Sequence, residues 1–259
     1  MSAEPGTEGS EAARRLAGVA WSFRCAVERD AEARFGRLAR RLAAAGFPAA
    51  LVALAERSSR DEHRHAALCA AEASLRGAAP PPLRGEPPSE IAPAGLTSAQ
   101  AALYEVVAAC CVTETESTAV LTTLLSLVSD PRLRTVLRSL ARDEVRHARL
   151  GWACLAHAHG RGEAAFLGPL VPGMLEGAAP ADLFLDDAAP GRADPALLAH
   201  GVLPHGLKRE VFVRTLEEVI CPGLAALGVD DGPARGWLAW RRGAPAQRRA
   251  SAAGGAARR

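Results

Sequence analysis

The same charged nonapeptide occurs twice in this chain, as RDEHRHAAL at residues 60–68 and as RDEVRHARL at residues 142–150. Each copy contains Glu-x-x-His and lies inside a mostly apolar pattern, rich in Ala and Leu, that favours helix. A Glu and a His three residues apart lie on one face of a helix. The fold must therefore accommodate two equivalent Glu/His pairs on two helices.

The composition also favours an all-α fold. The chain has 259 residues, of which 49% are hydrophobic and 4% aromatic, whereas strands prefer aromatic and β-branched side chains. The net charge of +2 is too small to indicate a nucleic-acid partner. We find neither a signal peptide nor an uncharged apolar run of about 18 residues, so we expect a cytoplasmic protein with no membrane partner.

Helical periodicity and capping signals divide the chain into five expected helices. They span residues 11–45, 48–76, 97–128, 131–157 and 207–227, the last with a kink at Pro222. Short turns join the first two helices and the next two, which should form antiparallel hairpins. The Pro- and Gly-rich segment 77–96 connects the hairpins. One long crossover is the connectivity of ferritin-like four-helix bundles, so we expect that bundle with a C-terminal fifth helix.

The rest of the chain gives weaker signals. We expect residues 1–10 to be disordered, residues 11–158 to form the bundle, and residues 159–240 to form an irregular segment and the fifth helix, packed on the bundle. Residues 241–259 are basic and of low complexity, and we expect a disordered tail. The six cysteines form no Cys-x-x-Cys pair, so we expect reduced cysteines, most of them in the core.

The inner face of each bundle helix contains charged residues. Steps of three and four residues place Glu62 and His65 on the inner face of the second helix, and Glu144 and His147 on that of the fourth. The same trace places Glu114 on the inner face of the third helix.

The first helix leaves two candidates, because both Glu28 and Glu32 lie on its inner face. Cys-x-x-Glu at residues 25–28 matches Cys-x-x-Glu at residues 111–114. This weak internal repeat favours Glu28, and Glu32 remains an alternative ligand.

A metal centre would explain so many inward charges. An isolated carboxylate in an apolar core is strongly unfavourable unless it is paired. A lone Glu-x-x-His is a weak signal, but one Glu from each of two helices with Glu-x-x-His from each of two others is the ligand set of a di-iron or di-manganese site. The predicted ligands are Glu28, Glu62, His65, Glu114, Glu144 and His147, and we predict no catalytic residue beyond them.

Asp61 and Asp143 each precede a predicted ligand glutamate. A metal-bound histidine usually donates its other N–H to a carboxylate, which fixes the ring. In an antiparallel bundle, Asp61 would reach His147 and Asp143 would reach His65. The simpler alternative is that both aspartates are solvated helix charges.

Over about residues 12–157 the chain resembles the ferritin-like di-iron carboxylate superfamily, and within it uncharacterised bacterial ferritin-like domain proteins. The resemblance rests on Glu28, on RDEHRH and RDEVRH, and on Glu114 within CVTETES. It implies chemistry with O₂ or peroxide at two Fe ions, and Mn or a mixed Fe/Mn pair is an alternative.

We therefore expect an oxidoreductase of oxygenase or peroxidase type that acts on an unknown small-molecule substrate with an unknown electron donor. A non-catalytic protein for iron binding, storage or detoxification is the alternative, and a metal-free structural bundle is a third class. A homodimer is compatible with all three.

Overall fold

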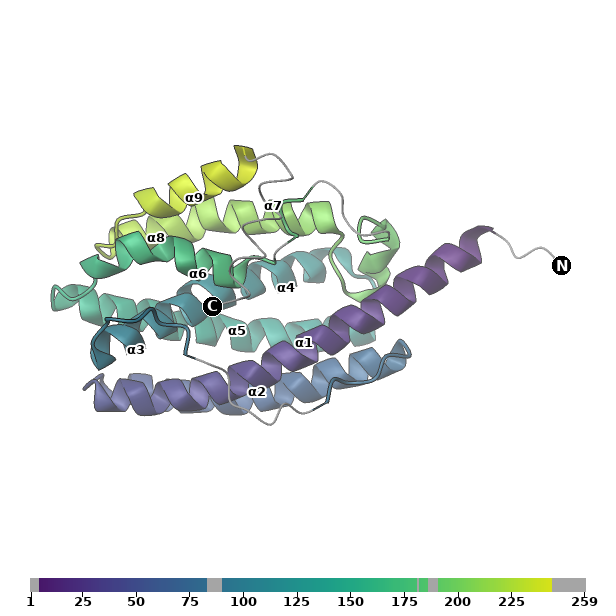
Figure 1. Ribbon diagram of the computed structural model, residues 1–259. Coiled ribbons are helices and arrows are strands. Elements are labelled where there is room, and N and C mark those ends of the chain that lie inside the picture. Colours follow the sequence, from purple (N-terminus) through teal and green to yellow (C-terminus); the bar gives the residue numbers. More distant parts are fainter. Residues whose placement is uncertain (1–4, 83–89, 181, 186–190, 244–259) are drawn as a thin grey trace.

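The computed structural model describes residues 5–82, 90–180, 182–185 and 191–243 (Figure 1). Within these ranges the chain forms helices and connecting segments, with no strand. The all-α prediction is confirmed for this part of the chain. None of its helices is both long enough and apolar enough to cross a membrane.

Two long helices, α1 (Pro5–Ala44) and α2 (Ala49–Leu75), pack along each other. Gly46 has a φ of 76° in the turn between them, a left-handed conformation that glycine adopts without a steric penalty. Because α1 begins at Pro5, residues 5–10 are helical, although we expected disorder; residues 1–4 lie outside the described residues. Figure 1 shows the N-terminal part of α1 projecting beyond the other helices.

The expected third helix is a continuous rod with a change of winding at its centre. It consists of α3 (Ser98–Val106), a π-helical segment (Val107–Glu114) and α4 (Thr115–Leu127). Thr97 and Gln100 form a capping box at its start, because each side chain accepts a hydrogen bond from the backbone N–H of the other. The π segment was not predicted.

The long helix α5 (Pro131–Gly160) follows after a tight break. The Asp130 side chain caps it by accepting a hydrogen bond of 2.8 Å from the Arg132 N–H, and Pro131 occupies the first turn. α5 packs against α2, α4 and the π segment. It therefore brings the second nonapeptide towards the first.

Shorter elements cover one side of these long helices. They are a 3₁₀ turn (Ala165–Leu170), α6 (Val171–Ala178), a second 3₁₀ turn (Pro195–His200), α7 (His205–Thr215), a π segment (Leu216–Ile220), α8 (Cys221–Ala226) and α9 (Gly232–Gly243). The expected fifth helix corresponds to α7, the π segment and α8, so the irregular winding lies just before Pro222. α7 contacts α4, and α6 contacts the first π segment.

Helix α9 was not predicted, because its basic end merges with the basic tail in the sequence. Its Arg241 is only 2% exposed. The guanidinium lies 5.4 Å from the ring centre of Trp237 and pairs with Glu176. The first three residues of the expected tail are therefore helical, and the rest of the tail lies outside the described residues.

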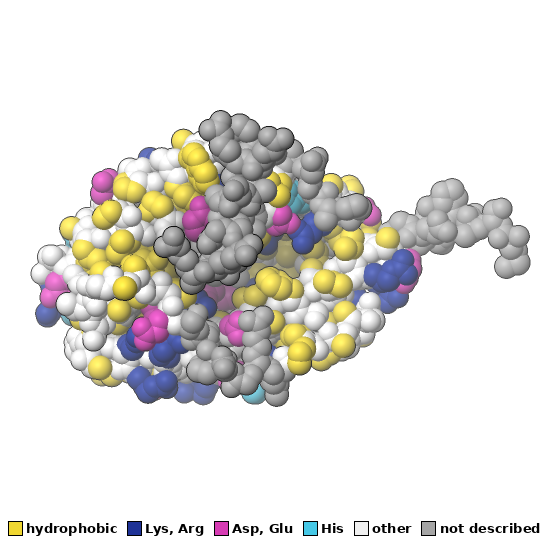
Figure 2. All heavy atoms as spheres, in the orientation of Figure 1, with side chains coloured by type: hydrophobic (Ala, Val, Ile, Leu, Met, Phe, Trp, Pro, Cys, Tyr) yellow, Lys and Arg dark blue, Asp and Glu magenta, His cyan; other side chains and the backbone are white. Residues whose placement is uncertain are grey.

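The interior is apolar apart from a few charged clusters. All six cysteines are buried and free, as expected for small core residues. Figure 2 shows one face of the molecule, with Lys and Arg side chains along its lower edge, over α1 and α2, and hydrophobic side chains scattered over the rest of it.

Candidate metal centre

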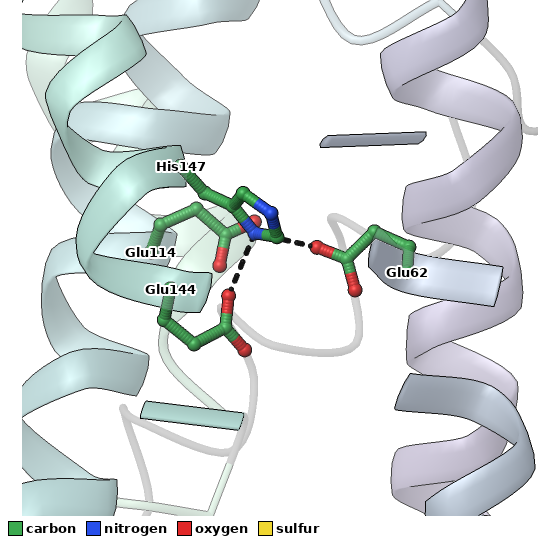
Figure 3. Close-up of side chains that lie close together, drawn as sticks. All are labelled: Glu62, Glu114, Glu144 and His147. Carbon is green, nitrogen blue, oxygen red and sulfur yellow. Dashed lines mark hydrogen bonds and ion pairs between the residues drawn. The ribbon is translucent and has the colours of Figure 1, made fainter. Parts of the chain in front are cut away.

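Two groups of acidic and histidine side chains meet inside the long helices. The first offers four ligand atoms that all lie within 4.8 Å of one another, from Glu62, Glu114, Glu144 and His147 (Figure 3). The second satisfies the same condition with Glu28, Glu62 and His65. The structure therefore brings all six predicted ligands together. Even the most exposed of the six, Glu114, is only 7% exposed.

The two Glu-x-x-His pairs are joined across the space between α2 and α5. His147 Nδ1 lies 2.9 Å from Glu144 Oε2 in its own helix and 2.9 Å from Glu62 Oε1 of α2. His65 Nδ1 lies 3.1 Å from Glu62 Oε2. Figure 3 shows Glu62 reaching from α2 towards the other three labelled residues. Glu62 is thus the centre of the cluster and the member common to both groups.

The π-helical segment determines where Glu114 lies, because Glu114 is its last residue. A Cβ added to Gly151 of α5 would lie 2.5 Å from Cys110 Cβ, so the two helices approach too closely for any larger residue. The hydroxyl of Thr113 donates to the Ala108 carbonyl and that of Thr115 to the Cys110 carbonyl, at 3.2 and 3.4 Å. Such π bulges are frequent at functional sites.

Two aspartates contact the far side of the histidine rings in the crossed arrangement that we expected. Asp143 Oδ2 lies 3.3 Å from His65 Nε2, and Asp61 Oδ2 lies 3.5 Å from His147 Nε2. Each aspartate therefore belongs to one nonapeptide and faces the histidine of the other.

Arginines hold both aspartates from the outside. Arg64 Nη2 lies 2.8 Å from Asp61 and 2.9 Å from Asp143, and Arg146 also pairs with both. Burial disfavours the charged form of Asp143, but hydrogen bonds from Arg142 and His65 outweigh burial and lower its pKa to about 2. Both nonapeptides thus supply an Asp–Arg layer outside their Glu–His pairs.

Arg24 is a site residue that the sequence analysis missed. Its Nε lies 2.7 Å from Glu28 Oε1, and its Nη2 lies 3.4 Å from Glu144 Oε1 and 3.1 Å from the hydroxyl of Ser117. Arg24 lies one helical turn before Glu28, on the same inner face of α1. That spacing was visible in the sequence and could have identified it.

Two carboxyl groups of the cluster, those of Glu62 and Glu114, resist ionisation. Burial, followed by the charges of Glu144 and Glu28, raises the pKa of Glu62 well above its usual range. Burial and the charges of Glu144 and Glu62 do the same to the pKa of Glu114. Ionising three carboxyl groups in close contact is electrostatically unfavourable unless a cation lies between them.

Glu144 and His147 instead form an ion pair. Burial disfavours the charged form of each, but their mutual hydrogen bond prevails, aided on His147 by the nearby carboxyl group of Glu62. The pKa of Glu144 is lowered to about 2 and that of His147 is raised to about 11. The proton on His147 is therefore the main counter-charge next to Glu62 and Glu144.

The side chains of the cluster are suited to hold divalent cations. Among the described residues, Arg24 is the only Arg or Lys that pairs with the four glutamates. The Nδ1–H of His147 faces two carboxylates and cannot fully satisfy both, and Glu62 Oε1 is buried without a hydrogen-bond partner. Carboxylate oxygens and imidazole nitrogens are suitable ligands for iron and manganese.

The alternative ligand Glu32 does not reach the cluster. Its carboxylate lies 3.2 Å from Nδ1 of the exposed His63 and is 38% exposed itself. Both residues lie on the outer surface of the α1–α2 pair. The weak Cys-x-x-Glu repeat was therefore the better guide to the inward glutamate of α1.

Comparisons of this chain with protein-family models, with curated proteins and with solved structures each found no match. The function of this chain must therefore be inferred from the geometry and chemistry of the cluster itself.

Proposed function

We propose that this chain is a ferritin-like di-iron carboxylate oxidoreductase that uses O₂ or peroxide to oxidise a small molecule. The observation that supports the proposal most directly is the pair of ligand groups that share Glu62. The ligands come from four helical segments in the Glu, Glu-x-x-His, Glu, Glu-x-x-His order that is typical of such centres.

The arrangement of the long helices supports the same proposal. The α1–α2 pair is followed by a long connection, and then by the rod of α3, the π segment and α4, which packs on α5. This order agrees with the single crossover of ferritin-like bundles.

The two ligand groups suggest how the residues would divide between two metals. Glu28, Glu62 and His65 would hold one, and Glu114, Glu144 and His147 the other, with Glu62 within reach of both. When bound, two irons, or manganese in one or both positions, supply the redox chemistry that these side chains lack. Arg24 orients Glu28 and Glu144, and the buried position of the ligands excludes bulk water.

The first test is an anaerobic Fe(II) titration of the metal-free protein, followed by exposure to air and an absorbance scan. We expect saturation at two irons per chain and oxidation of both. Glu114→Ala and His147→Ala should abolish oxidation of the bound iron. Normal oxidation in both variants, or no iron binding by the wild-type chain, would contradict the proposal.

A matched pair of variants on α1 sharpens the test. Glu28→Ala should reduce the stoichiometry or the rate of oxidation, whereas Glu32→Ala should leave both unchanged, because Glu32 lies outside the cluster. Uptake of many irons per chain would instead favour the storage alternative, since two sites cannot hold them.

A further inference from the structure

A second charged feature lies outside the ligands, at the surface between α2 and α5. It is an open cleft of about 550 Å³ with six charged side chains along its walls: Arg57, Arg60, Asp61, Arg64, Arg142 and Arg146. We refer to it as the arginine cleft. The metal centre needs its aspartate but does not account for this concentration of arginines.

The positive charge of the cleft exceeds what its carboxylates can balance. Asp61, on the wall, and the buried Asp143 pair with Arg64 and Arg146. Five guanidinium groups against these two carboxylates leave a net charge of +3. Among the described residues, the side chains of Arg57 and Arg60 have no hydrogen-bond or ion-pair partner.

The spacing of these arginines places their positive charges close together, which is unfavourable when no anion is bound. Arg57, Arg60 and Arg64 follow one another at steps of three and four residues, so they lie on one face of α2 and repel each other. Arg142 and Arg146 repeat this spacing on α5 and face the same cleft. A solvated row of arginines on one helix is common, but two facing rows converge on whatever occupies the space between them.

We propose that the arginine cleft binds a phosphoryl group, either inorganic phosphate or a phosphate monoester. The planar guanidinium donates two parallel hydrogen bonds to carboxylate or phosphate oxygens. One arginine is enough for a monoanionic carboxylate, whereas a dianion with three terminal oxygens can accept from several arginines at once. The proposal depends on the cleft alone and holds whichever metal, if any, the neighbouring centre binds.

An anion bound in the cleft would be linked to the metal centre through a short series of side-chain contacts. Arg64 and Arg146 would bridge the phosphoryl group to Asp61 and Asp143, which contact the rings of His147 and His65. A phosphorylated small molecule held there would lie next to the outer side of the histidines.

The test is calorimetric titration of the purified full-length protein, as isolated, with inorganic phosphate, phenyl phosphate and benzoate at low ionic strength. We expect saturable binding of both phosphates and much weaker binding of benzoate. The double variant Arg57→Gln/Arg60→Gln should weaken phosphate binding by about tenfold or more, since it removes charged hydrogen bonds. These side chains are exposed and unpartnered, so the fold should tolerate the change, which thermal unfolding can verify.

The matched control is Arg15→Gln/Arg214→Gln. It removes the same charge from exposed positions of α1 and α7 that do not line the cleft, and it should leave phosphate binding unchanged. Equal affinity in the two double variants would overturn the proposal, because phosphate would then bind at the metals or diffusely. Absence of phosphate binding, or tight binding of a short DNA duplex without binding of phosphate, would overturn it as well.

Discussion

Two buried glutamates on the same helical rod have opposite surroundings. Glu105, at the end of α3, is fully buried and lies 3.1 Å from Arg37 Nη2 and 2.8 Å from Arg41 Nη1. Glu114, at the end of the π segment, is nearly as buried, but its charged neighbours are Glu144, Glu62 and His147. Two arginines balance the first carboxylate, while the second lies among other carboxylates.

The two glutamates differ in whether arginines compensate the charge of the buried carboxylate. Glu72 follows the pattern of Glu105, because Arg76 and Arg132 hold its carboxylate and lower its pKa against the effect of burial. Glu62 and Glu114 have raised pKa values because nothing comparable balances them. A buried carboxylate that the protein leaves uncompensated indicates a ligand that arrives from outside.

The largest effect on folding should come from the balanced glutamate. Glu105→Ala would leave Arg37 and Arg41 near a buried site without their common partner, and we expect a loss of about 3–5 kcal/mol in the free energy of unfolding. Urea unfolding with and without added metal measures it. The loss should be the same in both conditions, and a loss that appears only with metal would contradict the structural role.

The aspartates outside the centre should act on the metal more than on the fold. Asp143→Asn weakens the acceptor for His65 Nε2, and we expect an affinity for Fe(II) or Co(II) that is about 10–100-fold lower. Competition with a chelator measures the affinity. The matched control is Asp130→Asn at the N-cap of α5, away from the metal centre. Asn caps a helix as well as Asp does, so this change should leave the fold intact. Equal losses in both variants would exclude a specific role for Asp143.

Much of the centre was predictable because its residues obey helical spacing. The Glu-x-x-His pairs and Glu114 follow from periodicity, since an inward position on a regular helix is fixed by its distance in sequence from other inward positions. Arg24 obeys the same rule and was missed only because an inward arginine was not sought.

The features that could not be predicted depend on contacts between distant segments. The π segment before Glu114 exists where Cys110 packs against Gly151, a close approach that neither local sequence reveals. The Cys-x-x-Glu repeat favoured Glu28 over Glu32, but it could not reveal the physical reason, which is how α1 is rotated against α2, where Glu32 pairs with His63. Helix α9 was missed because Arg241 is buried by tertiary packing with Trp237.

The raised pKa values predict how metal affinity depends on pH. Without metal, Glu62 and Glu114 retain protons above the usual carboxyl range, and His147, with a pKa raised to about 11, is protonated at neutral pH. Metal binding must release these protons, so affinity should rise with pH, by about tenfold per pH unit for each proton released. Anaerobic competition titrations between pH 6 and 8 measure the slope. An affinity independent of pH, after correction for the chelator, would contradict these protonation states.

The smallest change in the free energy of unfolding should come from Glu114, which has no arginine partner in the part of the chain that the structure describes. Its sign should be opposite to that of Glu105→Ala, because the substitution should stabilise the metal-free fold. A carboxyl group whose pKa is raised on folding binds more protons in the folded state, so it lowers stability as pH rises above its unfolded pKa. Glu114→Gln removes this penalty while keeping the shape of the side chain. In metal-free protein we expect it to raise the free energy of unfolding by about 1 kcal/mol at pH 7, and by less at pH 5.

The same variant should lose the stabilisation that added metal gives the wild-type chain. Glu72→Gln is its control, because a carboxylate whose pKa is lowered by arginines stabilises the fold above its unfolded pKa and loses that contribution in acid. It should therefore cost most stability at pH 7 and least at low pH. Urea unfolding at two pH values measures both variants. If the effect of the two substitutions on the free energy of unfolding changed in the same direction with pH, Glu114 and Glu72 would have similar charge surroundings, and the distinction between them would be wrong.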